Sequence, residues 1–295
     1  MRPFALLALA LSACAPEFVD QPWLVREPKV IAVIADPPEV RPGATAVFRV
    51  VVASPGGTVT GAQASWSLCT DPKPLTENGS VSTRCLEDHP ASRQVGPEVT
   101  LQIGSNACSL FGPDTPPGSF RPRDPDPTGG YYQPVIVGLD GATSFGFERL
   151  LCDPAGVSND VARDFAARYA PNANPVIARL SASIGGQGMA FERIPAGATV
   201  TLTLEWTAES AESFPLIDLQ SLALADGRES LQASWFATTG QLSSARTGGS
   251  AGDFATTSDN IWIAPQSTGL AFLWAVLRDS RGGSAAWTQQ VEVVP

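Results

Sequence analysis

A period of two in the placement of apolar side chains is the feature that most restricts how this chain of 295 residues can fold. The alternation occurs over residues 47–52, 98–103 and 199–204. Successive side chains of a β-strand point to opposite faces, so each segment predicts a strand with one face in a core and the other in water. The chain also contains 27 Gly and 26 Pro, which is natural for a β-protein with many turns. Short strands between such turns predict an all-β sandwich or barrel.

Three stretches of the first half recur in the second half, in the same order. The paired stretches are residues 40–50 and 194–204, residues 62–66 and 231–235, and residues 128–140 and 268–279. A repeat of more than a hundred residues predicts duplicated domains rather than a solenoid of short units. We therefore expect one domain over residues 28–153 and a second over residues 175–295, with a linker over residues 154–174.

The first fourteen residues have the pattern of an export signal. One positive charge at Arg2 precedes an apolar run over residues 4–11, and small residues follow before Cys14. The run is far shorter than the roughly 20 apolar residues that a membrane-spanning helix needs. The pattern therefore predicts a secretory signal, and no later stretch is expected to span a membrane.

The sequence Leu11-Ser12-Ala13-Cys14 resembles the lipobox of bacterial lipoproteins. The resemblance implies that residues 1–13 are removed and that diacylglycerol on the Cys14 thiol holds the protein on a membrane. Two or more acyl chains anchor a protein stably, whereas one holds it weakly. Residues 14–27 are the expected tether, and Ala15 implies the outer membrane of a bacterial cell envelope. The alternative is an ordinary signal peptide with a chance Cys at the cleavage site.

The net charge excludes one class of partner. The chain carries 29 acidic and 19 basic residues, for a formal net charge of −10 at pH 7. Such a protein repels nucleic-acid phosphate, and the sequence has no basic run with interleaved aromatic residues. We therefore expect no nucleic-acid partner.

The second repeat carries residues that resemble the bacterial immunoglobulin-like and PKD-like domains of surface proteins. These are residues 235–240, the Ile-Trp-Ile-Ala-Pro of residues 261–265, and residues 269–283 with their Trp, Asp and Gly-Gly. The match covers residues 175–295 well and the first repeat less well, because that repeat has insertions near residues 70–95 and 104–130. It implies two tandem immunoglobulin-like β-sandwiches joined by a short helical linker, with a central Trp between sheets. The expected core of the second sandwich includes Trp206, Trp235, Trp262 and Trp274.

Once Cys14 is assigned to lipid, Cys69, Cys85, Cys108 and Cys152 remain. An even number of Cys in an exported chain predicts two disulfides, and four Cys allow three connectivities. If the strands run as in the immunoglobulin-like domains, Cys69, Cys108 and Cys152 lie towards one end of the first sandwich. On that basis we expect the pairs Cys69–Cys85 and Cys108–Cys152. With no Cys-x-x-Cys and a single His, a zinc site is not expected.

The linker has helical rather than alternating periodicity. Ser158-Asn159-Asp160 offers an N-cap, and Val161, Phe165 and Tyr169 follow at helical spacing. We expect a short helix over residues 160–169 whose apolar stripe packs on a domain face. The alternative is a helix that recognises a partner.

No residue pattern points to catalysis or to a cofactor. His89 is the only His, and no Gly-x-Ser-x-Gly elbow is present to pair with it. No Gly-rich loop that cradles phosphate precedes a helix. Calcium needs about six to eight oxygen ligands, and the only suggestive groupings are Asp124 with Asp126 and Asp253 with Asp259. Asp that forms turns is the default interpretation, so we expect neither a cofactor nor a metal ion.

The most unusual segment is a Pro- and Gly-rich stretch over residues 111–132. Long irregular loops tend to be functional or disordered, and aromatic and Arg side chains carry interface energy. The candidate binding loop therefore comprises Phe120, Arg121, Arg123, Tyr131 and Tyr132. The alternative, which we favour, is a loop folded over the sandwich edge, with the two Arg paired to Asp124 and Asp126.

The sequence thus predicts a membrane-anchored, non-catalytic lipoprotein that binds an unknown protein or carbohydrate, or supports an envelope assembly. One alternative is a hydrolase, or its accessory subunit, that acts on envelope or extracellular polysaccharide. Two carboxylates about 5–9.5 Å apart in a cleft would be its sign. A second alternative is a calcium-stabilised adhesion module.

Overall fold

The computed structural model describes residues 21–74, 76–86, 93–113, 126–218, 220–250 and 253–295. In these residues the chain consists mainly of β-strands, and its α-helices, α1 (Ala107–Leu110) and α2 (Asn159–Arg168), are short. Neither helix in this part of the chain has the length and apolar character needed to cross a membrane. The prediction of an all-β fold is confirmed.

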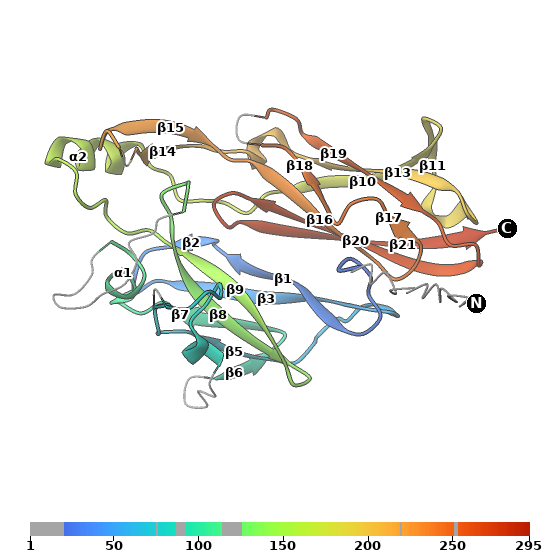
Figure 1. Cartoon of the computed structure of the whole chain (residues 1–295), viewed down its shortest axis with the longest axis horizontal. Helices are drawn as coiled ribbons and strands as arrows, with labels where there is room; N and C mark the ends of the chain where they lie inside the picture. Colours follow the sequence, from blue (N-terminus) through green and yellow to red (C-terminus); the bar gives the residue numbers. More distant parts are fainter. Residues whose placement is uncertain (1–20, 75, 87–92, 114–125, 219, 251–252) are drawn as a thin grey trace, which may run out of the picture.

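Residues 29–150 form two facing sheets, which we call the N-terminal sandwich (blue to green in Figure 1). In one sheet, β3 (Thr45–Ser54) pairs with β1 (Lys29–Asp36), β4 (Gly57–Thr58) and β7 (Glu98–Gln102). The other has the order β2 (Glu39–Val40), β9 (Ala142–Leu150), β8 (Tyr131–Leu139), β5 (Ala64–Leu68) and β6 (Gln94–Gly96). Phe48 and Trp66 are fully buried between these sheets, with their ring centroids 6.5 Å apart. The apolar side of the alternating strands therefore forms the core, as predicted.

Residues 177–294 form the C-terminal sandwich (yellow to red in Figure 1). Its first sheet has the order β11 (Gln187–Met189), β10 (Ile177–Ile184), β13 (Thr199–Trp206), β19 (Thr257–Ile263) and β17 (Gln241–Leu242). Its second sheet has the order β12 (Ile194–Pro195), β21 (Ser284–Val294), β20 (Gly269–Asp279), β16 (Leu231–Ala237) and β18 (Arg246–Gly248). A separate hairpin, β14 (Ser213–Ile217) with β15 (Leu224–Arg228), lies next to α2 at one end of the molecule (Figure 1).

The strand pairing repeats between the two sandwiches. The short strand β2 is parallel to β9, and the short strand β12 is parallel to β21 in the same way. Trp66 of β5 and Trp235 of β16, which end the repeated Gln-Ala-Ser-Trp, are both buried in sandwich cores. The duplicated sequence therefore has a duplicated topology of immunoglobulin-like type. Division into two separate domains stays a prediction, because the sandwiches also pack on each other.

The contact between the sandwiches has an apolar core of its own. Trp274 and Val276 of β20 are fully buried against Ile31 and Ile34 of β1. The Trp274 indole Nε1 donates to Thr58 Oγ1 at 2.8 Å. The expectation that Trp274 lies in the core of its own sandwich is wrong. The reason is that β20 is buried on both faces, and Trp274 points to the face opposite the sandwich interior.

Trp206, Trp235 and Trp262 do lie in the core of the C-terminal sandwich, and Trp23 joins them there. The backbone amide of Val25 donates to the carbonyl of Ala237 at 2.9 Å, next to an isolated bridge between Leu24 and Ala237. The segment expected as a tether over residues 14–27 is therefore docked on the sandwich from Trp23 onward. Cys14 and the export signal lie outside the described residues.

Two disulfides fasten the insertions of the N-terminal sandwich. Cys69, just after β5, bonds Cys85, and Cys108 of α1 bonds Cys152, just after β9. This is the pairing predicted from the sequence. The first bond holds the chain segment of residues 70–84 near the outer face of β8, where Val81 packs with Ile136.

The linker forms the helix that its periodicity predicts. Helix α2 begins after Ser158, whose side chain accepts a hydrogen bond from the backbone amide of Val161 at 3.3 Å. The rings of Phe165 and Tyr169 stack with their centroids 4.8 Å apart, on the apolar stripe of the helix. An N-cap Ser accepts a hydrogen bond from a backbone amide of the first turn that has no partner within the helix.

Candidate functional site

A buried carboxylate at the end of the N-terminal sandwich receives several donors. Because β2 pairs with β9 in the register Glu39 to Arg149, the two side chains are neighbours. The Glu39 carboxylate accepts from Arg149 Nε at 3.1 Å, from the Tyr169 hydroxyl at 2.7 Å and from the backbone amide of Asn172 at 2.7 Å. Buried charges are tolerated when they are paired and hydrogen-bonded in this way.

A second buried Arg comes from the C-terminal sandwich. Arg281, in the turn between β20 and β21, is 1% exposed. Its Nε donates to Glu229 and its Nη2 to Glu212, both at 2.6 Å, and its Nη1 donates to the backbone carbonyl of Ala170 at 3.1 Å. Its guanidinium carbon lies 4.7 Å from the ring centroid of Phe214. The planar guanidinium of Arg donates several hydrogen bonds and stacks on an aromatic ring at the same time. Lys is poorly suited to this position, because its ammonium group is not planar.

These contacts form one buried charge network, made up of Glu39, Arg149, Tyr169, Asn172, Glu212, Glu229 and Arg281. The Tyr169 hydroxyl connects the two halves, since it donates to Glu39 and accepts from Arg281 Nη1 at 3.4 Å. The network thus connects the N-terminal sandwich, the linker and the C-terminal sandwich. Together with the Trp274 contact, it fixes how the two sandwiches lie against each other.

Burial raises the pKa of several carboxyl groups in or beside the network. Burial and the neighbouring Glu39 together raise the pKa of Glu148 to about 9. Burial and the neighbouring Asp279 raise the pKa of Glu229 to about 7, although its ion pair with Arg281 acts to lower it. Burial also raises the pKa of Asp279, although hydrogen bonds from backbone amides act to lower it. Glu148 is 0% and Glu229 1% exposed. Neither carboxyl is presented to a substrate, so the raised pKa values do not indicate an acid–base catalyst.

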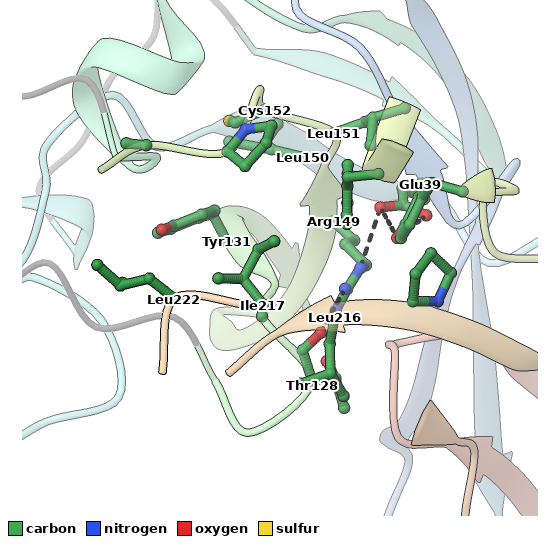
Figure 2. Close-up of a pocket in the computed structure, with 16 residues that line it drawn as sticks. Glu39, Thr128, Tyr131, Arg149, Leu150, Leu151, Cys152, Leu216, Ile217 and Leu222 are labelled. Carbon is green, nitrogen blue, oxygen red and sulfur yellow. Dashed lines mark hydrogen bonds and ion pairs between the residues drawn. The ribbon is translucent and has the colours of Figure 1, made fainter. Parts of the chain in front are cut away.

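One hollow at this junction is a small, mostly apolar cavity, which we call the junction cavity (Figure 2). Figure 2 shows Leu150, Leu151 and Cys152 on one side, Leu216, Ile217 and Leu222 on the other, and the Glu39–Arg149 pair beside them. Its volume is about 80 Å³. Small-molecule sites typically have about 300–1,000 Å³, so the junction cavity is too small for a ligand of that size.

A larger hollow opens where the two sandwiches meet, and we call it the junction groove. Its volume is about 610 Å³, within the range of ligand-binding sites. One wall is the disulfide-held segment of the N-terminal sandwich, with Asp71, Lys73 and Ser80. A second wall is the end of β20 and the turn that follows it in the C-terminal sandwich, with Arg278 and Gly282.

Aromatic side chains of β8 and β9 lie between these walls. They are Tyr132 of β8 and Phe145 and Phe147 of β9, whereas the neighbouring Tyr131 packs against the core of the N-terminal sandwich. The rings of Tyr132 and Phe147 meet edge to face, with centroids 6.5 Å apart. Phe147 is 41% exposed. The groove therefore has an aromatic floor and polar walls.

Gly282 brings the second wall close to that floor. Its φ is +102°, and a Cβ added there would lie 3.2 Å from a ring carbon of Tyr132. A larger residue would be strained at this φ and would press on the Tyr132 ring. The Tyr132 hydroxyl accepts from Arg149 Nη1 at 2.8 Å, so the floor is also tied to the buried charge network.

The sequence-predicted site residues fall into two groups. Tyr131 and Tyr132 begin β8 and line the junction groove. Phe120, Arg121 and Arg123 of the candidate binding loop lie outside the described residues, as do His89 and Asp124. Asp126, the expected partner of the loop Arg residues, accepts from the backbone amides of Thr128 and Gly130 and lies 3.8 Å from Arg149.

The candidate calcium ligands have other partners. Asp253 accepts from the backbone amide of Ala255 at 2.9 Å, and Asp259 accepts from Thr203 Oγ1 at 2.6 Å. Within the described ranges, no three His, Cys, Asp or Glu side chains gather as metal ligands would. Nothing in this part of the chain favours the calcium-stabilised alternative.

The buried charge network is the feature that the sequence did not reveal. Glu39 and Arg149 are 110 residues apart, and Arg281 lies 52 residues from Glu229. No local spacing connects residues so distant, and each alone is indistinguishable from a surface charge. The one available signal was the alignment of the two sequence repeats. In that alignment β2 is equivalent to β12, and each lies parallel to the last strand of its own sandwich, β9 or β21.

The chain matches no protein-family model, and its sequence matches no curated protein. Similar solved structures include the Yersinia pseudotuberculosis adhesin InvE, with 11% identity, 90% of this chain and 58% of that chain covered, and a TM-score of 0.24. The Escherichia coli adhesin FdeC has 12% identity, coverage of 92% and 65%, and a TM-score of 0.21. The native E. coli alpha-2-macroglobulin has 12% identity, coverage of 92% and 17%, and a TM-score of 0.28. The chain thus spans less than two thirds of each of these proteins. Because all three TM-scores are below 0.5, these likenesses do not indicate what this chain binds.

Proposed function

We propose that the protein is a lipid-anchored, non-catalytic binding module of the bacterial cell envelope that holds a protein or carbohydrate in the junction groove. The observation that carries this proposal is the contrast between two kinds of site. The junction groove is open and has the exposed ring of Phe147 on its floor, whereas Glu148 and Glu229, whose pKa values are raised, are sealed inside the protein. Open aromatic surface favours binding, and sealed acids do not favour hydrolysis.

The fixed arrangement of the sandwiches supports the same proposal. The groove has one wall from each sandwich, so it exists only while they keep their relative position. Trp274, Arg281 and the linker residue Asn172 all make contacts that hold this position. A binding site formed in advance loses less conformational entropy when its ligand binds.

The anchor is the part of the proposal that rests on the lipobox resemblance. We expect lipid on Cys14 and location at the outer membrane, with two tandem immunoglobulin-like domains outside the bilayer. Labelled palmitate should enter the wild-type protein and not a Cys14→Ser variant. A mature protein that starts elsewhere than Cys14, or that carries no label, would overturn the anchor and leave the groove proposal standing.

Photo-crosslinking in living cells tests the groove whatever the identity of its ligand. A benzoylphenylalanine at exposed Ser80, on one wall of the groove, should form a covalent adduct with the bound partner. The same residue at exposed Thr199 of β13, which does not line the groove, is the matched control. Equal adducts at both positions, or none at either, would contradict a binding function for the groove.

A further inference from the structure

The charged side chains on the first wall of the junction groove already have partners within the protein. The Lys73 ammonium donates to the backbone carbonyl of Gly79 at 2.9 Å. The Asp71 carboxylate lies 3.6 Å from the guanidinium of Arg84. An ionic ligand at this wall would have to displace one of these contacts.

The charged side chains on the second wall of the groove also have partners within the protein. Arg278 donates to Ser234 Oγ at 3.2 Å and to the backbone carbonyl of Ile31 at 3.0 Å. Asp279 accepts from the backbone amides of Arg281 and Gly283, at 2.8 and 2.9 Å. The four charges on the two walls are two acidic and two basic, so they also balance. The groove therefore has neither a net charge nor a preferred sign for its ligand.

The floor and the hydroxyl groups of the walls indicate what kind of neutral ligand fits. Phe147 is the exposed ring of the floor, because the Tyr132 ring is already in contact with Arg149, Phe147 and Gly282, and Phe145 packs against the cluster that contains Val81. The ring face of Phe147 has the negative quadrupole that weakly positive C–H groups favour. Ser80 and Ser280 lie on different walls, and each hydroxyl can both donate and accept. A sugar ring presents C–H groups on its faces and hydroxyl groups at its edge, in the same arrangement.

We propose that the junction groove binds a neutral oligosaccharide, with sugar rings against the aromatic floor and their hydroxyl groups towards the two walls. This inference rests on the proposed binding function and names its ligand class. A volume of about 610 Å³ accommodates a short run of sugar rings rather than a single small solute. A neutral, Pro-rich peptide is the competing ligand, because aromatic grooves also receive such segments.

Calorimetric titration of the full chain, in a detergent without a sugar headgroup, tests the ligand class. The probes are cellohexaose, maltohexaose, chitohexaose and xylohexaose as neutral glycans, oligogalacturonate as an anionic glycan, and a Pro-rich dodecapeptide. We expect at least one neutral glycan to bind with a dissociation constant below 1 mM. That limit corresponds to a binding free energy of about −4.1 kcal/mol. The anionic glycan and the peptide should bind at least tenfold more weakly.

Two variants locate the binding. Phe147→Ala, at a residue 41% exposed, should weaken glycan binding about tenfold or more without unfolding the protein. Phe254→Ala removes an equally large ring that is 75% exposed and lies outside the groove, so it should bind like wild type. Ser80→Trp should block the groove from its other wall and abolish binding.

The outcomes separate this inference from the function on which it rests. No neutral glycan bound below 1 mM, together with a crosslinked partner at Ser80, would overturn the glycan inference and leave the binding function intact. Stronger binding of the peptide than of any glycan would do the same. Neutral glycan binding that Phe147→Ala and Phe254→Ala weaken equally would overturn the groove as the site.

Discussion

Burial sets the charge of Glu148. Its two carboxyl oxygens have no hydrogen-bond partner within the described residues, and its pKa is raised to about 9. A carboxyl group that is buried without a cationic partner stays protonated, because the ionised form loses its hydration. At neutral pH, Glu148 is therefore a neutral group beside the buried charge network.

The raised pKa predicts how stability depends on pH. The folded state binds this proton more tightly than the unfolded state, whose pKa is near 4.5. The stabilisation is therefore complete below about pH 4.5 and is lost as the pH rises towards 9. Glu148→Gln should leave the free energy of unfolding nearly unchanged at pH 4 and raise it at pH 9. Urea unfolding across this pH range measures the free energy of unfolding, with exposed Glu98→Gln as the control. If the free energy of Glu148→Gln and that of wild type changed with pH in parallel, the raised pKa of Glu148 would be contradicted.

Arg281 should be among the most sensitive residues to substitution. Arg281→Ala leaves Glu229 buried beside no cation, which typically costs about 3–5 kcal/mol of folding free energy. Adding Glu229→Gln should recover part of this loss, since the buried charge is then removed. Urea unfolding of the two single variants and the double variant measures the coupling. If the effects of Arg281→Ala and Glu229→Gln on the free energy of unfolding were strictly additive, the two side chains would not be coupled. A loss from Arg281→Ala no larger than that from exposed Arg193→Ala would also contradict the ion pair.

Strands β20 and β1 depart from the alternating pattern, and both are buried on two faces. In β20 the residues from Leu273 to Leu277 are all buried, and in β1 the apolar run includes Ile31, Ala32 and Ile34. Strands buried on both faces have continuous apolar runs rather than alternation. These two strands meet between the sandwiches, but β8 has a similar buried run and contributes nothing to the apolar cluster between them, so a continuous apolar run does not by itself locate the interface.

The role of Trp274 can be tested against a neighbour on the same strand. Trp274→Ala should lower the free energy of unfolding by about 3–5 kcal/mol, because it leaves a cavity between the sandwiches. Leu270→Ala, at a residue 60% exposed on the same strand, should change it by less than about 0.5 kcal/mol. Urea unfolding of both variants decides this, and a small effect of Trp274→Ala would mean that the interface is not a structural core.

Local pattern predicted the strands and the α2 helix, because each follows from neighbouring residues. The core position of Trp235 was implied by the immunoglobulin-like resemblance. The disulfide pairs followed from the immunoglobulin-like resemblance. The junction groove could be predicted only in part. Tyr131 and Tyr132 stood out in sequence, but Gly282 and Arg278 reach the groove from the other sandwich. How two sandwiches pack depends on side chains far apart in the chain, and periodicity says nothing about it.

The two sandwiches form one body. The apolar cluster around Trp274, the buried charge network and the docked Trp23 all connect parts that are distant in sequence. If these contacts hold, the protein should unfold in one cooperative transition. The groove would then have a constant width, set by its two walls.

Residual dipolar couplings of backbone amides test this most directly, because they report the orientation of each sandwich in a common frame. We expect couplings from residues 29–150 and residues 177–294 to fit a single alignment tensor with the arrangement in Figure 1. Two tensors of clearly different magnitude or orientation would mean that the sandwiches move independently. In that case the junction groove would not be a preformed site.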